Sequence, residues 1–150
     1  MRAVIQRVRE AAVTIDGELF SGIGQGLCCL IGVESGDADE DIDYICRKIM
    51  GLRIFDDPGG IMNIDVGEAG GDILLVSQFT LLGDAKKGRR PSYSSAEQPH
   101  KANELFDDLV KRIAALSTGK VATGKFQAMM DVSLVNHGPV TILLDSRKHF

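Results

Sequence analysis

The stretch Gly26-Leu27-Cys28-Cys29-Leu30-Ile31-Gly32-Val33 is nearly all apolar, as expected of a strand that is buried on both faces. Asp72 to Phe79 is a second apolar strand, and it runs into the polar residues Ser77 and Gln78. A sheet with strands of this kind needs a covering layer on each of its faces. These two stretches therefore predict a layered fold with buried strands at its centre.

Further strands are predicted towards both ends of the chain. Ala3 to Val8 and Ala11 to Ile15 alternate and are rich in β-branched residues, and Asp16-Gly17 is a tight-turn signal that leads into Glu18 to Ser21. Three strands are expected to finish the chain, at Val121 to Phe126, Val132 to Val135 and Val140 to Leu144.

Two helices are predicted between these strands. Asp37 can cap the first, and apolar residues recur at helical spacing after it; the second runs from about Pro99 to Leu116. Two helices cannot cover both faces of so many strands. We therefore expect one α/β domain spanning residues 1–150, with three layers in the order β/β/α. The expected order along the chain is two strands, two successive strand–helix units and three final strands. We expect the sheets to pack on each other and both helices to lie outside them.

The composition is that of an ordinary globular protein, with 150 residues, 44% hydrophobic and 25% charged. No apolar run is long enough to cross a bilayer, and the first residues lack the features of a signal peptide, so we expect a cytoplasmic protein without a membrane partner. Cys28, Cys29 and Cys46 have no metal-ligand spacing and are expected to be buried free thiols. We expect neither a metal nor a cofactor.

The net charge of −4 argues against a broad basic surface for nucleic acid, but it does not exclude a local one. Lys86, Lys87, Arg89 and Arg90 fall within five residues around Gly88. This cluster is either a solvated loop or, beside an RNA site, a means of neutralising a few phosphates.

Catalytic bases are scarce. The chain has three histidines, of which His100 and His149 are expected to be exposed, while His137 either reaches a site or is structural. No nucleophile elbow, phosphate-binding loop or dinucleotide fingerprint is present. Acid–base chemistry by protein side chains is hard to assemble from these residues.

Two features remain. Ser77-Gln78-Phe79-Thr80-Leu81 places polar side chains at the end of an apolar strand, where they either serve a site or are satisfied locally. Asn136-His137-Gly138-Pro139-Val140-Thr141 sets a proline between two strand segments, where it should interrupt the ladder. The simplest interpretation of Gly138-Pro139 is a plain turn, since cis bonds make up only about 5–6% of X–Pro bonds.

Together and in this order, the two motifs resemble the signatures of the D-aminoacyl-tRNA deacylase family. The similarity covers almost the whole chain. It includes Gln6-Arg7-Val8, Gly51-x-Arg53-Ile54-Phe55, Met62-Asn63, Gly70-Gly71, Gly88-x-Arg90-Pro91-Ser92 and Ser133 to Thr141.

The resemblance implies an enzyme that hydrolyses the ester between a D-amino acid and the terminal adenosine of tRNA. It also implies a homodimer with its active site at the subunit interface, in which a cis Gly138-Pro139 from one subunit reaches into the pocket of the other. Ser77, Gln78, Phe79 and Thr80 would be the catalytic pocket wall, and Phe126 and Met130 would lie near the adenosine. Arg7, Val140 and Thr141 would support the Gly–Pro element, although Arg7 can equally be a strand arginine that bonds a surface carboxylate.

Backbone carbonyls of a rigid Gly–Pro pair would exclude the side chain of an L-substrate by sterics. Glycine would pass this filter, so glycyl-tRNA is a predicted secondary substrate. The implied mechanism is assistance by the 2′-hydroxyl of the tRNA, with Thr80 as a covalent nucleophile the alternative. The alternative functions are a non-catalytic RNA-binding dimer and a general esterase. The tail, residues 146–150, matches nothing in the family and either orders against the partner subunit or stays mobile.

Overall fold

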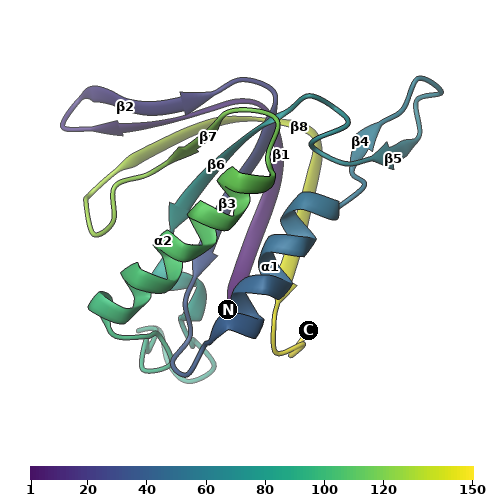
Figure 1. Cartoon of the computed structure of the whole chain (residues 1–150). Coiled ribbons are helices and arrows are strands. Elements are labelled where there is room, and N and C mark those ends of the chain that lie inside the picture. The colour runs from purple at the N-terminus through teal and green to yellow at the C-terminus, as the bar shows by residue number, and fades with distance from the viewer.

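The computed structural model describes all 150 residues as one six-stranded sheet with two α-helices on one side and a small separate hairpin (Figure 1). The elements are β1 (Arg2–Ile15), β2 (Glu18–Ile23), β3 (Gly26–Gly32), α1 (Asp39–Gly51), β4 (Phe55–Asp56), β5 (Met62–Ile64), β6 (Asp72–Ser77), the 3₁₀ turn η1 (Phe79–Leu82), α2 (Pro99–Leu116), β7 (Val121–Thr123) and β8 (Asp131–Asp145).

The strands of the sheet follow the order β2-β1-β3-β6-β7, and β8 pairs with the other edge of β1. The first half of β1 pairs with β3, and its second half pairs with β2. β3, β6 and β7 are parallel to one another. The Ser21 hydroxyl donates to the carbonyl of Thr123 at 2.7 Å and thereby joins β2 to β7, so the sheet curls until it is nearly closed.

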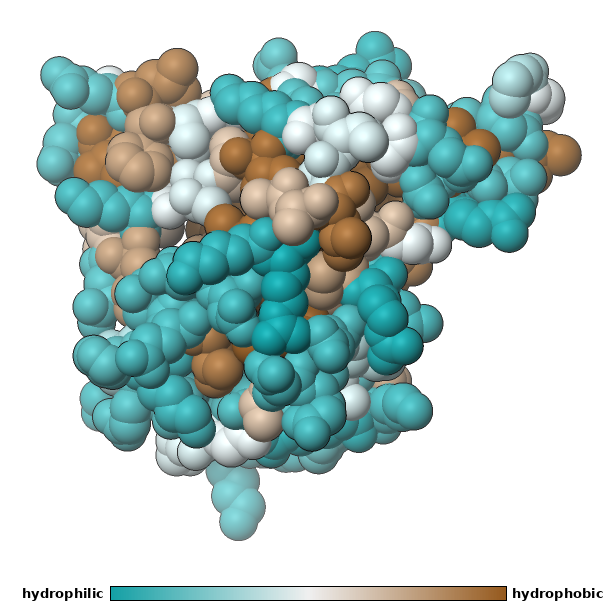
Figure 2. Space-filling view, in the orientation of Figure 1, coloured by the Kyte–Doolittle hydropathy of each residue, from teal (hydrophilic) through white to brown (hydrophobic).

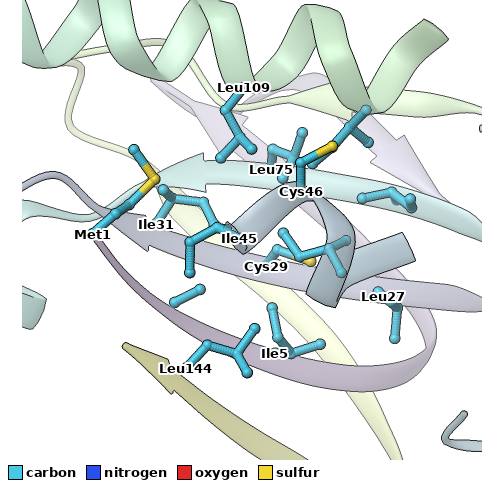
Figure 3. Close-up of a cluster of buried hydrophobic side chains, with 14 of the residues drawn as sticks. Met1, Ile5, Leu27, Cys29, Ile31, Ile45, Cys46, Leu75, Leu109 and Leu144 are labelled. Atoms are coloured by element: carbon cyan, nitrogen blue, oxygen red, sulfur yellow. The ribbon is translucent and has the colours of Figure 1, made fainter. Parts of the chain in front are cut away.

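This curl produces two cores. The larger one lies between the sheet and the helices and includes Ile5, Ile31 and Leu75 (Figure 3). The smaller one lies inside the curl and includes Val8, Val13 and Leu74. The layers are therefore helices, sheet, and the curled-over part of the same sheet, which confirms the predicted β/β/α arrangement. The two strand layers are parts of one continuous sheet, because β1 and β8 pass from one layer into the other.

The predicted strand boundaries need correction at both ends of the chain. Residues 3–8 and 11–15 form the single strand β1, because its neighbours change along its length while pairing with β8 continues. Residues 132–135 and 140–144 likewise belong to the single strand β8. The strand expected to reach Phe126 ends at Thr123, and the one expected to reach Phe79 ends at Ser77.

The prediction for the start of the first helix is wrong. Asp37 does not cap α1: the N-cap is Ala38, whose amide donates to Asp41 at 2.9 Å. The Asp37 carboxylate instead accepts hydrogen bonds from the Met1 ammonium and from the amide of Glu34, each at 2.7 Å. The second helix begins and ends where predicted.

Two turns connect neighbouring antiparallel strands, and the sequence predicted one of them. Asp16 and Gly17 have φ of 51° and 80°, as a tight hairpin turn requires, which confirms the predicted turn. The second turn, at residues 57–60, connects β4 to β5 in a hairpin that the sequence did not predict. Both strands of this hairpin are too short to show a pattern. No helix of the protein is long and apolar enough to span a membrane.

Candidate functional site

A pocket of about 630 Å³ lies at the carboxyl ends of the parallel strands β3, β6 and β7. This is the edge at which sheets with parallel strands bind ligands, because the loops that leave the strands diverge there. Ten of its fifteen lining residues are hydrophobic. The wall consists of Val33, Val76, Ser77, Gln78, Phe79, Ala96, Glu97, Pro99, Ala102, Phe126, Gln127, Ala128, Met129, Met130 and Val132.

The segment from Ser77 to Thr80 forms one side of this pocket where the chain leaves β6. The amide of Gln78 makes the last link to β3, donating to the Ile31 carbonyl at 2.7 Å. The chain then turns into η1, which places the Phe79 side chain 58% exposed at the rim. The Gln78 side-chain amide donates to the Thr80 hydroxyl, so these two side chains act as a pair. Thr80 itself is exposed and is not part of the pocket wall.

Gly32 allows η1 to lie this close to β3. A Cβ atom at Gly32 would stand 2.5 Å from Leu82 Cδ2 and 3.1 Å from the carbonyl oxygen of Gln78. Any side chain at this position would push η1 outward. The glycine therefore determines where Gln78 and Phe79 lie.

The opposite wall comes from the segment after β7 and from the start of α2. The Phe126 ring lies 6.5 Å from the ring of Phe106 on α2, and Met130 Sδ accepts a hydrogen bond from the Lys125 amide at 3.2 Å. The structure thus brings Phe126 and Met130 together with Ser77, Gln78 and Phe79.

The pocket wall offers little acid–base chemistry. Glu97 is its one ionisable side chain. Hydrogen bonds from the amides of Gln98 and Gly36, together with Lys101, hold the pKa of Glu97 below its usual value, so this carboxylate is a weak base. No group of three or more His, Cys, Asp or Glu side chains is positioned to hold a metal ion.

The cysteines and histidines lie outside the pocket. All three cysteines are buried free thiols, as predicted, and burial raises the pKa of Cys28 to about 11. The His100 side chain is 89% exposed and His149 is exposed, which also agrees with the prediction. His137 contributes its backbone carbonyl to a hydrogen bond, as described next.

The Gly138–Pro139 peptide bond is cis and lies in a bulge of β8. Gln6 pairs with Thr141 and Val8 with Asn136, so residues 137–140 all stand opposite the single residue Arg7. Gly138 has φ of +122°, and both residues of the cis pair are exposed. The bulge replaces the clean break between two strands that proline was expected to cause.

Arg7 holds this bulge from inside the protein. Its side chain is 7% exposed, Nε donates to the His137 carbonyl at 3.0 Å and Nη1 donates to the Ile54 carbonyl at 2.7 Å. A contact of 3.4 Å to the half-exposed Asp56 is secondary. Of the two supporting residues predicted beside it, Val140 packs against the larger core and Thr141 contacts the Gln6 side chain.

Within one chain, the bulge and the pocket lie at opposite ends of the sheet. Arg7 pairs with Leu27 at the start of β3, whereas Ser77 pairs with Ile31 near the end of β3. Gly138 and Pro139 are absent from the pocket wall. One protomer therefore does not bring all the predicted site residues together.

Sequence reasoning missed part of the pocket wall. Val33 could have been found, since it ends a strand parallel to the one that carries Ser77. Ala102, Gln127 and Glu97 had no signal, because their position depends on how α2 and the segment after β7 pack on the sheet.

Comparison with known proteins identifies the family of this chain. The family model described as D-Tyr-tRNA(Tyr) deacylase matches residues 4–145. A relative named D-aminoacyl-tRNA deacylase from Kosmotoga olearia is 56% identical over 150 residues, and one of the same name from Natranaerobius thermophilus is 49% identical; each alignment covers 100% of both chains.

Two solved structures share the fold. One titled "c-Myc DNA Unwinding Element Binding Protein" has a TM-score of 0.92 and 37% identity, covering 97% of this chain and 98% of that one. Another, titled "Structural Analysis of a probable eukaryotic D-amino acid tRNA deacylase", has a TM-score of 0.78 at 17% identity, covering 95% of this chain and 97% of that one, and supports the fold alone. The chain belongs to the D-Tyr-tRNA(Tyr) deacylase family, whose members are enzymes that act on aminoacyl-tRNA.

Proposed function

We propose that this protein hydrolyses the ester bond of D-aminoacyl-tRNA and releases a free D-amino acid and tRNA. The observation that carries the proposal is the pocket at the carboxyl edge of the parallel strands, which Ser77, Gln78 and Phe79 border. Its mostly apolar wall suits the terminal adenosine with its amino acid, and Phe126 and Met130 offer apolar surface to the base.

The chemistry follows from what the wall lacks. No histidine or cysteine lines the pocket, and its one carboxylate has a lowered pKa. The 2′-hydroxyl of the terminal adenosine is then the group that assists ester cleavage, while Gln78 and the unpaired first amides of the η1 turn polarise the carbonyl. Thr80 as a nucleophile is the second choice, because it lies outside the wall.

Chirality requires the Gly138–Pro139 bulge, and one protomer holds it away from its own pocket. We infer a homodimer in which the bulge of one subunit enters the pocket of the other and its backbone excludes an L side chain. Two observations support this arrangement. β8 is an edge strand whose outer side is unpaired, and it exposes Leu134, Val135 and Leu143. Glycine, which has no side chain to exclude, would be accepted from glycyl-tRNA.

The test compares three substrates: a D-aminoacyl-tRNA, its L counterpart and glycyl-tRNA, with ester loss followed over time. We expect rapid loss from the D-form, slower loss from glycyl-tRNA and none above background from the L-form. Equal rates on the D- and L-forms would overturn the chirality filter. No loss from any of the three would overturn the hydrolase.

The second candidate function is a non-catalytic nucleic-acid-binding dimer. It is favoured by the 37% identical solved structure, whose title describes a protein that binds a DNA element. Tight binding of uncharged tRNA without any ester loss would support it over the deacylase. For either function we place the protein in the cytoplasm, where tRNA is aminoacylated.

A further inference from the structure

The loop between Asp84 and Ser92 is closed by a pair of backbone hydrogen bonds. Each residue donates its amide to the other's carbonyl, at 2.7 and 2.8 Å. The Asp84 carboxylate also accepts the amide of Lys86 at 2.8 Å, and Gly88 has φ of +75°, which suits glycine at the tip. All residues of this loop are exposed. The loop, closed by the Asp84–Ser92 hydrogen bonds, therefore presents four cationic side chains to solvent: Lys86, Lys87, Arg89 and Arg90.

These four cations have no anionic partner within the protein. Elsewhere Arg2, Arg112 and Arg147 each lie within ion-pair distance of at least one carboxylate, whereas no side chain of the loop forms a salt bridge. The sole acidic group in the loop, Asp84, is engaged with a backbone amide. In a protein of net charge −4, the loop is a local concentration of free positive charge.

Both ends of the loop are connected to the pocket. Before it, η1 carries Phe79, whose ring meets that of Tyr93 edge to face at 5.2 Å between centroids. After it, Ser95 donates to the Leu82 carbonyl at 3.0 Å, and the next residues, Ala96 and Glu97, are part of the pocket wall. In Figure 1 this loop lies at the bottom of the molecule, and Figure 2 shows that the near surface of this lower part is mostly hydrophilic.

We propose that the loop from Lys86 to Arg90 binds phosphates of the acceptor arm of tRNA while the aminoacyl-adenosine end occupies the pocket. This inference rests on the proposed function. RNA that enters the pocket by its 3′ end must carry its preceding phosphates over the surface beside the pocket, and the segment that connects Phe79 and Ala96 of the pocket wall presents four unpaired cations. The Debye length at physiological salt is about 8 Å, so contacts between these cations and phosphates should weaken as the salt concentration rises.

The test uses paired neutral variants that keep Gly88. These are Lys86→Gln with Lys87→Gln, and Arg89→Gln with Arg90→Gln. The matched control is Arg47→Gln with Lys48→Gln, which removes two exposed cations from α1 outside the pocket. For each protein, kcat/KM is measured on D-aminoacyl-tRNA and on 3′-O-D-aminoacyl-adenosine, between about 50 and 200 mM salt, together with the unfolding temperature.

We expect each loop pair to lower the ratio of kcat/KM on tRNA to kcat/KM on the aminoacyl-adenosine by about tenfold at low salt. The slope of log kcat/KM on tRNA against log salt should become shallower by about 1 to 2, as for the loss of one or two phosphate contacts. The control pair should change neither quantity. A loss of equal size on both substrates, or a ratio unchanged from the control, would overturn the proposal.

The failure of the proposed function gives a different result. If the unmodified protein cleaves neither substrate, the deacylase proposal fails, and the affinity for uncharged tRNA then tests the loop alone. In that case the loop pairs should weaken binding about tenfold relative to the control pair. Equal affinities would overturn the phosphate site.

Discussion

The guanidinium of Arg7 donates from Nε to the carbonyl oxygen of His137 at 3.0 Å, and thereby fixes the peptide that precedes Gly138–Pro139. Arg7 is buried, so this hydrogen bond is protected from water. A second donor, Nη1, ties the same guanidinium to the Ile54 carbonyl beyond the end of α1. Arg7 on β1 therefore ties the bulge of β8 to the segment that follows α1.

Replacing Arg7 with methionine should lower the stability of the protein and weaken the proposed chirality filter. The substitution keeps most of the apolar stem but leaves two carbonyls without their charged donor, so the free energy of unfolding should fall by about 2 to 3 kcal/mol. Hydrolysis of L-aminoacyl-tRNA should rise relative to the D-form. Urea unfolding and paired D and L assays measure the two effects.

The control for that change is Arg9→Met on the same strand. Arg9 is exposed and makes no hydrogen bond or ion pair to another side chain or backbone group, so its loss should cost little. If the ratio of the hydrolysis rates on D- and L-aminoacyl-tRNA is the same in Arg7→Met as in Arg9→Met, then Arg7 supports the fold and not the selectivity.

A methyl group at Gly32 should displace η1. The new Cβ would stand 2.5 Å from Leu82 Cδ2 and close to the Gln78 carbonyl, so Gly32→Ala should cost about 1 to 3 kcal/mol of stability through overpacking. The rate of deacylation should fall by more than the fraction of unfolded protein at the assay temperature accounts for, since Gln78 and Phe79 move with the turn. The comparison is Gly51→Ala at the end of α1, where an added Cβ meets nothing within 4 Å and no loss is expected. Equal activity in the two variants would contradict this role of Gly32.

Thr80→Ala distinguishes a positioning residue from a nucleophile. The Thr80 hydroxyl contacts the Gln78 side chain and is not part of the pocket wall, so we expect a loss of kcat within about tenfold. A covalent mechanism instead requires this hydroxyl, and a complete loss of single-turnover hydrolysis in a folded Thr80→Ala protein would favour it.

Removing the 2′-hydroxyl from the substrate tests the proposed mechanism from the other side. A D-aminoacyl-tRNA that ends in 2′-deoxyadenosine should be cleaved at least about 100-fold more slowly, because the hydroxyl that we propose to assist is removed and the pocket wall offers only the weakly basic Glu97 to replace it. Binding of the deoxy substrate should change little, which competition with the ordinary substrate measures. An unaffected cleavage rate would exclude the 2′-hydroxyl mechanism.

A charge on the free edge strand should separate the subunits. Leu143 on β8 is 58% exposed, so Leu143→Asp should leave the monomer folded while it opposes apolar contact with a second copy. Light scattering should show monomers, and specific activity should fall on dilution, because in the proposed dimer each pocket needs its partner's bulge. Leu116→Asp, at an equally exposed site of 60% at the end of α2, should remain a dimer with full activity. A monomeric and fully active Leu143 variant would refute the shared site.

Several elements could be predicted from local sequence because their causes are local. Asp16-Gly17 formed its tight turn since both residues adopt positive φ, and α2 began at Pro99, where a proline suits the first turn. The all-apolar β3 pointed to burial on both faces, and the layered fold followed from it. Asp37 failed as a cap because a distant group, the Met1 ammonium, binds its carboxylate.

Tertiary structure decided the rest. The sequence by itself determined the layers and the residues of both motifs, since apolar patterning and order along the chain are local properties. It could not show that β1 and β8 each run unbroken through two layers, because strand length depends on pairing with distant partners. Nor could it show that Ser77 and Phe126 line one pocket while Gly138 lies at the far end of the sheet beside Arg7. Those relations arise from the pairing of β6 with β7 and of β1 with β8, which brings together residues far apart in sequence.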